Sequence, residues 1–302
     1  MRWDDFRRSR NVEDARDDGP TGGIGGGMPM RGGLGIGTIL VLGLLGWALG
    51  IDPRLLIEGA DVLMRNAPQS QYQESLPREV GTPDDSTGQF VAAVLGSTED
   101  VWNEIFSEND RSYRAPRLRL FAGMTQSACG FAQAAMGPFY CPIDQRVFLD
   151  TSFFHEMQTR FRACKGKQCE FAQAYVIAHE VGHHVQNLLG ILPRAQKMQS
   201  AASSRAEANG IQVRVELQAD CLGGVWANRA QKHLNFIEPG DIEAALQTAS
   251  AIGDDTLQRK SQGRVVPDSF THGSAAQRQH WFMTGFKEGR ISACNTFAAR
   301  DL

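Results

Sequence analysis

Residues 174–187, AYVIAHEVGHHVQN, decide how the rest of this chain is interpreted. The stretch places three histidines and a glutamate in an otherwise apolar, helix-compatible run. His179 and His183 are four positions apart, so they lie about 40° apart on one helix face. Two imidazoles on adjacent turns can direct their nitrogens at one ion, as a tetrahedral zinc site requires. His184 is rotated by about 140° from His179 and cannot share that ion.

The glutamate of this stretch suggests chemistry beyond metal binding. Glu180 is angled away from the ion but can reach a water beside it, so HEVGH matches the HExxH pattern. That pattern assigns both histidines to zinc and the glutamate to general-base work. It has only three fixed positions and can arise by chance. The alternative is a polar helix face on which histidine pairs with glutamate.

A third metal ligand is expected, because a catalytic zinc usually takes three protein ligands and keeps one position open. Residues 215–221 read VELQADC, with Glu216 and Asp220 again four apart on a helix expected to begin after Asn209-Gly210. Glu216 can complete a His-His-Glu set. Asp220 can accept a hydrogen bond from the non-metal nitrogen of His179 and fix its tautomer. The alternative is an acidic pair on a solvated face, but the neighbouring side chains are apolar.

Periodicity and turn residues predict short strands followed by many helices, which is a helix-dominated α+β domain. The expected strands are 117–123, 137–142 and 146–150. The expected helices are 97–109, 151–164 (capped by Thr151), 169–190 (ended by Gly190), 194–208, 212–231, 239–252 and 274–289.

The first third of the chain divides by composition. Residues 1–33 hold mixed charge and a glycine cluster with few core-forming residues, which predicts a flexible tail. Residues 34–51, LGIGTILVLGLLGWALGI, carry no charge and are long enough to cross a membrane as a helix. A buried core helix or a cleaved secretory segment are the alternatives. Residues 52–95 are rich in Pro, Gln, Ser, Asp and Gly and predict a linker.

Charge and cysteine usage suggest where the domain lies. Arginines are more numerous before the apolar segment than after it, which predicts a single-pass protein with its N-terminus inside. The expected location is the inner membrane, with the domain facing the periplasm or cell exterior. All six cysteines follow the segment, which suits an oxidising compartment. Six cysteines permit 15 pairings. Proximity and elimination favour Cys129–Cys141, Cys164–Cys169 and Cys221–Cys294.

Several long motifs together resemble a known family. AYVIAHEVGHHVQNLLGI and VELQADCLGGVWA closely resemble the bacterial family of neutral zinc metallopeptidases. RWDDFRRSRNVEDARDDG is similar to its membrane-anchored members, and CGFAQAAMGPFYCPIDQRVFLD, THGSAAQRQHWFMTGFKEG and CNTF extend the likeness over nearly the whole chain. The resemblance implies a zincin-like peptidase domain, here 96–302, with Zn²⁺ held by His179, His183 and Glu216 and with Glu180 as base. CKGKQC, at 164–169, departs from that pattern.

The peptidase interpretation requires a further donor that stabilises the oxyanion of the tetrahedral intermediate. His272, in the polar turn FTHGSAAQ, is the preferred catalytic candidate, and Tyr140 and Tyr175 are alternatives. A single histidine in a turn is more often a surface residue. By analogy with zincins, the segment 121–140 is expected to offer an edge strand to an extended peptide. The other histidines, His155, His233 and His280, lack partner spacing and are interpreted as structural or exposed.

Three functions compete at this stage. A membrane-anchored zinc peptidase acting on a peptide or protein substrate is preferred, because Glu180 is intact. A zinc-stabilised binding or scaffold protein would use the same helices without turnover, but such a site is usually closed by a fourth protein ligand. Metal-assisted hydrolysis of a non-peptide amide is the third. The net charge of −3 and the pI near 6.2 predict no nucleic-acid partner.

Overall fold

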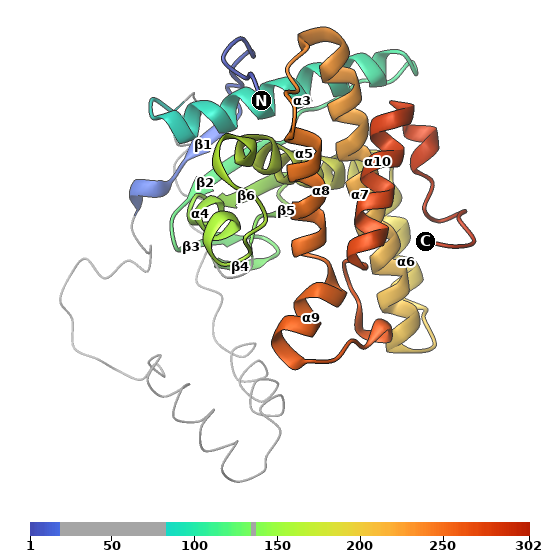
Figure 1. Cartoon of the computed structure of the whole chain (residues 1–302). Helices are drawn as coiled ribbons and strands as arrows, with labels where there is room; N and C mark the ends of the chain where they lie inside the picture. The colour runs from blue at the N-terminus through green and yellow to red at the C-terminus, as the bar shows by residue number, and fades with distance from the viewer. Residues whose placement is uncertain (19–82, 134–136) are drawn as a thin grey trace, which may run out of the picture. The chain divides into compact units, whose positions relative to one another are not determined.

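A small sheet and a larger group of helices build the part of the chain that the structure describes, residues 1–18, 83–133 and 137–302 (Figure 1). The structure is a computed structural model. In Figure 1 the strands gather on one side and the helices α5, α7, α8 and α10 on the other, with α3 running across both. The expected helix-dominated α+β fold is confirmed.

The main sheet has the order β1-β2-β6-β5. Its strands are β1 (Val12–Asp14), β2 (Arg117–Phe121), β5 (Phe139–Cys141) and β6 (Arg146–Asp150). β1, β2 and β6 are parallel, and β5 lies antiparallel to β6 at an edge. The strands β3 (Met124–Ser127) and β4 (Gly130–Gln133) form a separate hairpin. The sequence predicted β2, β5 and β6 but neither β1 nor this hairpin.

The helices carry most of the described chain. They are α3 (Ser86–Ser107), α4 (Ser152–Thr159), α5 (Cys169–Leu188), α6 (Ile191–Ser200), α7 (Arg205–Leu234), α8 (Asp241–Ala251), α9 (Asp254–Gln262) and α10 (Ala275–Glu288). Short 3-10 helices cover Arg16–Asp18, Gly166–Gln168, Pro267–Ser269 and Ile291–Cys294. Gly190 follows α5 with φ of 74°, in the left-handed region expected of a glycine that ends a helix.

Several helix boundaries differ from expectation, and at the starts of α7 and α4 a side chain other than the expected one binds the first turn. α7 begins at Arg205, after Ser204 accepts a hydrogen bond from the Glu207 backbone, and it runs through Gly210 without a break. The side chain of Thr151 makes no capping hydrogen bond to α4. The carboxylate of Asp150 instead accepts from the backbone N–H of Ser152. α9 was not predicted at all.

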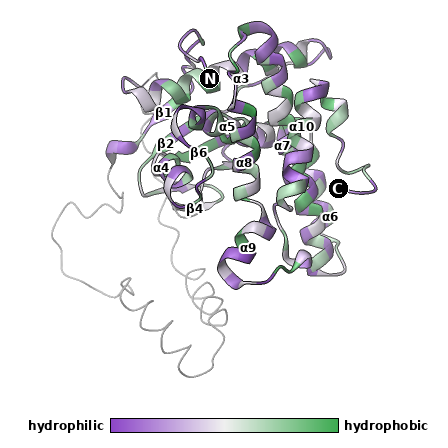
Figure 2. Cartoon of the chain, viewed as in Figure 1, coloured by the Kyte–Doolittle hydropathy of each residue, from purple (hydrophilic) through white to green (hydrophobic). Residues whose placement is uncertain are grey.

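The core is an aromatic cluster where α3, α5 and α7 meet. Trp102, Phe171, Trp226 and Phe236 are all fully buried, and the rings of Phe171 and Trp226 stack 6.4 Å apart. Figure 2 shows hydrophobic residues along these helices and the strands, with hydrophilic ones toward the outside. Because large aromatic side chains dominate core energetics, this cluster holds α5 and α7 in register.

Two glycines allow the helices around the core to approach closely. A Cβ on Gly182, inside HEVGH, would stand 3.0 Å from the Ala219 carbonyl oxygen on α7. A Cβ on Gly285 of α10 would stand 1.8 Å from the Cys221 carbonyl oxygen. Any side chain at Gly285 would therefore force α10 away from α7.

The prediction that residues 1–33 form a flexible tail is wrong for Met1–Asp18. Val12 is fully buried and pairs with Leu118 as the edge strand β1. Met1 and Phe6 are buried as well, and the backbone N–H of Ser9 donates to the carbonyl of Ala92. Composition suggested disorder because this segment has few apolar residues. Those few suffice because α3 and β2 supply the rest of the packing and the strand partner.

The linker expected over 52–95 is also too long. α3 begins at Ser86, where the Asp85 side chain accepts hydrogen bonds from two backbone N–H groups of the first turn. The domain therefore starts earlier than residue 96. The predicted membrane segment 34–51, the remainder of the tail and residues 52–82 lie outside the described residues. Among the residues that are described, no helix is long and apolar enough to cross a membrane.

Three disulfides join the pairs that the sequence favoured. Cys129–Cys141 links the β3–β4 hairpin to β5, and Cys164–Cys169 closes the loop before α5. Cys221–Cys294 ties α7 to the C-terminal segment across a sequence separation of 73. The pairing prediction is confirmed.

Candidate metal centre

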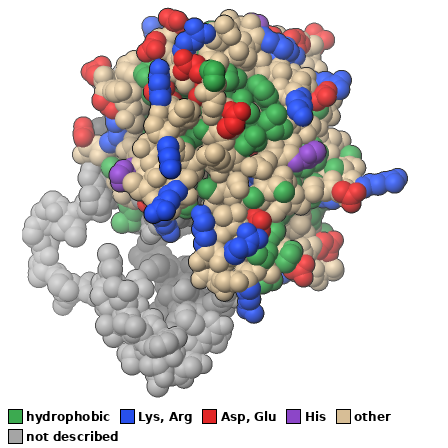
Figure 3. Space-filling view, in the orientation of Figure 1, with side chains coloured by type: hydrophobic (Ala, Val, Ile, Leu, Met, Phe, Trp, Pro, Cys, Tyr) green, Lys and Arg blue, Asp and Glu red, His purple; other side chains and the backbone are tan. Residues whose placement is uncertain are grey.

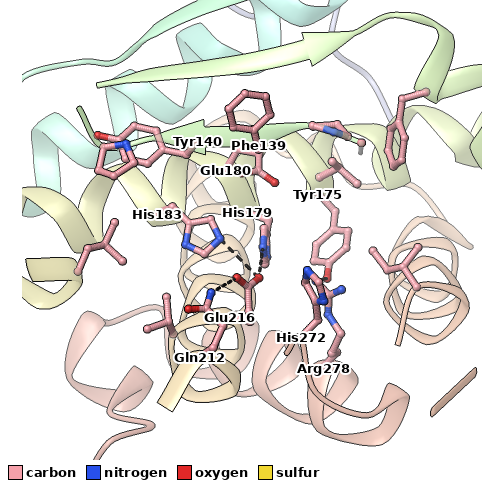
Figure 4. A pocket seen from close by; sticks show the side chains of 18 of the residues that line it. Phe139, Tyr140, Tyr175, His179, Glu180, His183, Gln212, Glu216, His272 and Arg278 are labelled. Carbon is pink, nitrogen blue, oxygen red and sulfur yellow. Dashed lines mark hydrogen bonds and ion pairs between the residues drawn. The ribbon is translucent and has the colours of Figure 1, made fainter. Parts of the chain in front are cut away.

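The three predicted ligands meet between α5 and α7 (Figure 4). His179 and His183 extend from adjacent turns of α5, as their spacing requires, and Glu216 faces them from α7. One ligand atom from each lies within 4.8 Å of the others. Glu216 Oε2 is 3.2 Å from His179 Nε2 and 3.5 Å from His183 Nε2.

This donor set fits zinc. Two imidazole nitrogens and one carboxylate oxygen are the ligands of many catalytic zinc sites, where a fourth position stays open. Gln212, one turn before Glu216, donates to Glu216 Oε1 at 2.9 Å, which leaves Oε2 toward the histidines. Among the described residues, this trio is the group that can hold a metal ion.

Each histidine is oriented by a partner on its far nitrogen. Asp220 Oδ1 lies 2.8 Å from His179 Nδ1, as the sequence predicted. An ionised carboxylate only accepts, so Nδ1 carries the proton and Nε2 is free for a metal. For His183, Gln186 Oε1 takes the same role at 2.9 Å from Nδ1. Gln186 is itself held by the carbonyl oxygen of Val215 on α7.

The electrostatics of the site favour positive charge between its carboxylates. Burial lowers the pKa of His179, but the charge and hydrogen bonds of Asp220 and Glu216 outweigh that effect and raise it to about 10. Burial raises the pKa of Glu216, yet the two histidines reverse this and hold it well below its usual range. A bound divalent cation satisfies the same demand for positive charge.

Glu180 lies on the wall of the cavity that contains the metal ligands. The cavity has a volume of about 760 Å³. Glu180 is 7% exposed, and burial raises the pKa of its carboxyl group. A raised pKa suits a group that must first accept and then return a proton.

His272 lines the same cavity from the loop before α10. Its Nδ1 is 3.3 Å from Asp254 Oδ1, and its backbone N–H donates to Asp254 Oδ2 at 2.6 Å. The hydrogen bond to Asp254 raises the pKa of His272, against the opposing effect of burial. Its Nε2 is thus the nitrogen left for the cavity.

The hydroxyl protons of Tyr140 and Tyr175, the two alternative oxyanion donors, are engaged in other hydrogen bonds. Tyr175 donates to Asp220 at 2.6 Å. Tyr140 lies 3.0 Å from His184 Nδ1, while His184 Nε2 is 2.6 Å from the carbonyl oxygen of Arg114. Because that carbonyl only accepts, Nε2 carries the imidazole proton and Tyr140 must donate to Nδ1. Burial lowers the pKa of His184 to about 4, which keeps the ring neutral.

The remaining histidines take no part in the site. His155, His233 and His280 are exposed, and His233 Nε2 pairs with Glu104 at 2.9 Å. His184 faces away from the metal ligands, as its position on the helix predicted.

The sequence did not identify four supporting residues, Gln186, Gln212, Asp254 and Arg278. Gln186 and Gln212 lie three and four positions from ligands on the same helices, a spacing that could have found them. Asp254 and Arg278 reach the site from α9 and α10, and no local spacing signals their contacts.

A strand borders the cavity opposite α7. Phe139 and Tyr140 of β5 line it, and Figure 4 shows them on the strand above the two histidines. β5 is an edge strand of its sheet. The structure thus places the last residues of the segment 121–140 beside the candidate metal centre.

Comparison with known proteins agrees with this centre. The sequence profile of a family described as "Putative neutral zinc metallopeptidase" matches residues 1–297. "Uncharacterized protein YpfJ" of Escherichia coli (strain K12) is 46% identical over 301 residues, covering 98% of this chain and 99% of its own. "Uncharacterized protein Rv2575" of Mycobacterium tuberculosis (strain ATCC 25618 / H37Rv) is 44% identical over 221 residues, covering 70% and 71%.

No solved structure gives a significant match to this chain. The profile match extends over the N-terminal strand, both site helices and the C-terminal segment. The chain therefore belongs to the family of putative neutral zinc metallopeptidases.

Proposed function

We propose that this protein is a zinc-dependent peptidase. The observation that carries the proposal is the convergence of His179, His183 and Glu216 within 4.8 Å, with Glu180 on the wall of the same cavity. Zinc, when bound, supplies a Lewis acid that polarises the scissile carbonyl and lowers the pKa of a water.

The remaining steps belong to side chains of this chain. Glu180 takes a proton from the attacking water and returns it to the leaving amine. His272 donates from Nε2 to the oxyanion that develops on the carbonyl, held in orientation by Asp254. An extended peptide would pair its main chain with the free edge of β5, as strands are added to open sheet edges elsewhere.

A catalytically silent scaffold is less well supported. A purely structural zinc site is usually closed by four protein ligands. Here the candidate group, within the described residues, offers three, and the cavity reaches it from the open side.

The experiment compares wild type with Glu180→Gln. The full chain is purified, its zinc content is measured, and a proteome-derived peptide library is digested and analysed by mass spectrometry. Cleavages made by wild type and lost in Glu180→Gln, at equal zinc content, are expected. Glu156→Gln is the matched control, because Glu156 also lines the cavity but pairs with Arg160. Zinc bound to both proteins without any cleavage would contradict the proposal.

We also propose a location at the inner membrane, with the domain on the periplasmic or exterior side. The uncharged residues 34–51 support membrane attachment. Because β1 pairs with β2, the proposal keeps residues 1–18 on the same side of the membrane as the domain. Three disulfides, with no free cysteine among the described residues, support an oxidising compartment. Acidic and basic side chains are interspersed over the face seen in Figure 3.

A further inference from the structure

Arg278 on α10 places a guanidinium group beside the metal centre. Its side chain is 4% exposed, and it packs against a carboxylate that is fully buried. Arg278 Nε donates to Asp220 Oδ2 at 2.8 Å, and Nη2 donates to Oδ1 at 2.9 Å. Such a bidentate contact fixes the plane of a carboxylate as well as its charge.

Asp220 Oδ1 is the atom where the contacts converge. It accepts from Arg278 Nη2, from the hydroxyl of Tyr175 at 2.6 Å and from His179 Nδ1 at 2.8 Å. Tyr175 and His179 are four apart on α5, Asp220 is on α7 and Arg278 on α10. Three helices therefore meet at one oxygen, directly behind a candidate metal ligand.

We propose that Arg278 is a positioning residue for the metal ligand His179, acting through Asp220. The inference rests on the proposed zinc centre. Arg278 holds the carboxylate in the orientation at which Oδ1 faces His179 Nδ1, and so directs His179 Nε2 toward the ion. Partners behind a metal ligand commonly change metal affinity 10- to 100-fold, because they fix its tautomer and angle.

Two other roles for Arg278 fit the contacts less well. It could bind substrate, but Nε and Nη2 are already committed to Asp220, and Nη2 also lies 3.3 Å from the Tyr175 hydroxyl. It could merely fasten α10 to α7. That junction is already secured by the close contact at Gly285, and the Cys221–Cys294 disulfide ties α7 to the segment that follows α10.

The test is a double-mutant cycle on zinc affinity, measured by chelator competition on the full chain. Arg278→Met should weaken zinc binding about 10-fold, and Arg278→Lys less, because lysine keeps the charge without the bidentate contact. In an Asp220→Ala background, Arg278→Met should change zinc affinity less than about 2-fold, since the carboxylate through which Arg278 acts on His179 is gone. An equal loss in both backgrounds, or no loss in either, would overturn the proposal.

The control is Arg229→Met. Arg229 also links α7 to the end of α10, through the Gly289 carbonyl, and it pairs with Glu108 far from the site. The Arg229→Met variant should be less stable to unfolding but should bind zinc as tightly as wild type. If Arg278→Met does not fold, Arg278→Lys completes the cycle with Asp220→Ala.

Failure of the peptidase proposal would be visible separately. Non-additive zinc affinities together with an absence of any cleavage would support the role of Arg278 and reject the enzyme. Peptide cleavage together with additive zinc affinities would support the enzyme and reject the role of Arg278.

Discussion

At the scale of single residues, the candidate site is defined by which nitrogen of each histidine holds a proton. Nδ1 of His179 faces Asp220, and Nδ1 of His183 faces Gln186. Both Nε2 atoms therefore face Glu216. His272 gives Nδ1 to Asp254 in the same way. A carboxylate or amide oxygen behind an imidazole therefore sets what its other nitrogen can do.

The Asp254–His272 pair predicts a pH dependence. His272 Nδ1 lies 3.0 Å from Thr271 Oγ1 and 3.3 Å from Asp254 Oδ1. When Nδ1 donates its proton to Asp254, Nε2 can donate only in the imidazolium form, so this donor is lost as pH rises through the pKa of His272. The hydrogen bond to Asp254 raises that pKa above the ordinary value for histidine; burial opposes it, Glu216 adds a smaller increase and Arg278 a smaller decrease. Asp254→Asn should therefore lower the pKa of His272 and shift the alkaline limb of the kcat/KM profile to lower pH. An unchanged limb would remove His272 from the oxyanion role.

A second residue-scale prediction concerns Gln186. Gln186→Leu leaves Nδ1 of the ligand His183 without its acceptor and removes the donor to the Val215 carbonyl and to Gln218 Oε1. Zinc affinity should fall about 10- to 100-fold, and the free energy of unfolding by about 1–3 kcal/mol. Chelator competition and urea unfolding measure the two effects. Gln231→Leu is the matched control. The Gln231 side chain donates to Asn235 and accepts from the backbone N–H of Ile237, so this variant should leave zinc affinity unchanged.

At the scale of elements, helix spacing was predicted well and helix boundaries were not. The α5 stretch carries its own signals, two histidines on one face and a left-handed glycine after the last turn. α3 and α7 extend beyond their predicted starts because Asp85 and Ser204 cap them earlier than the apolar periodicity suggested. Capping depends on one side chain, whereas periodicity is averaged over many residues.

The packing of α10 on α7 gives an element-scale prediction. Gly285→Ala would place a Cβ 1.8 Å from the Cys221 carbonyl oxygen, so we expect a loss of about 1–3 kcal/mol or more. Gly210→Ala is the matched control, because nothing lies within 4 Å of a Cβ there. In a helix interior it should stabilise by about 0.5–1 kcal/mol. Denaturant unfolding of both variants measures the difference, and equal effects would contradict the described helix contact.

At the scale of the whole molecule, the N-terminal segment belongs to the domain. Glu13 of β1 forms ion pairs with Arg119 on β2 and Arg146 on β6, at 3.1 and 3.3 Å. A Cβ on Gly96 of α3 would stand 2.2 Å from the Arg7 carbonyl oxygen, so α3 is shaped for this segment. The fold therefore requires residues 1–18 to lie on the same side of any membrane as residues 83–133 and 137–302.

That requirement is testable by labelling. Single cysteines replacing the exposed Arg10 and Asp110 should react with a membrane-impermeant maleimide from the same side of the membrane. The expectation of an N-terminus inside and a domain outside predicts opposite sides instead. Labelling from opposite sides would mean that β1 does not pair with β2 in the membrane-associated protein.

The sequence by itself determined the chemistry that lies within one helix. Four-residue spacing places His179 beside His183, and Glu216 one turn before Asp220, wherever these helices pack. Periodicity and turn residues also predicted the α+β class, and cysteine proximity and elimination predicted the disulfides. Only the tertiary structure decided how Arg278 reaches Asp220 across 58 residues and how Asp254 reaches His272. Contacts between elements depend on packing of the whole core, which no local pattern encodes.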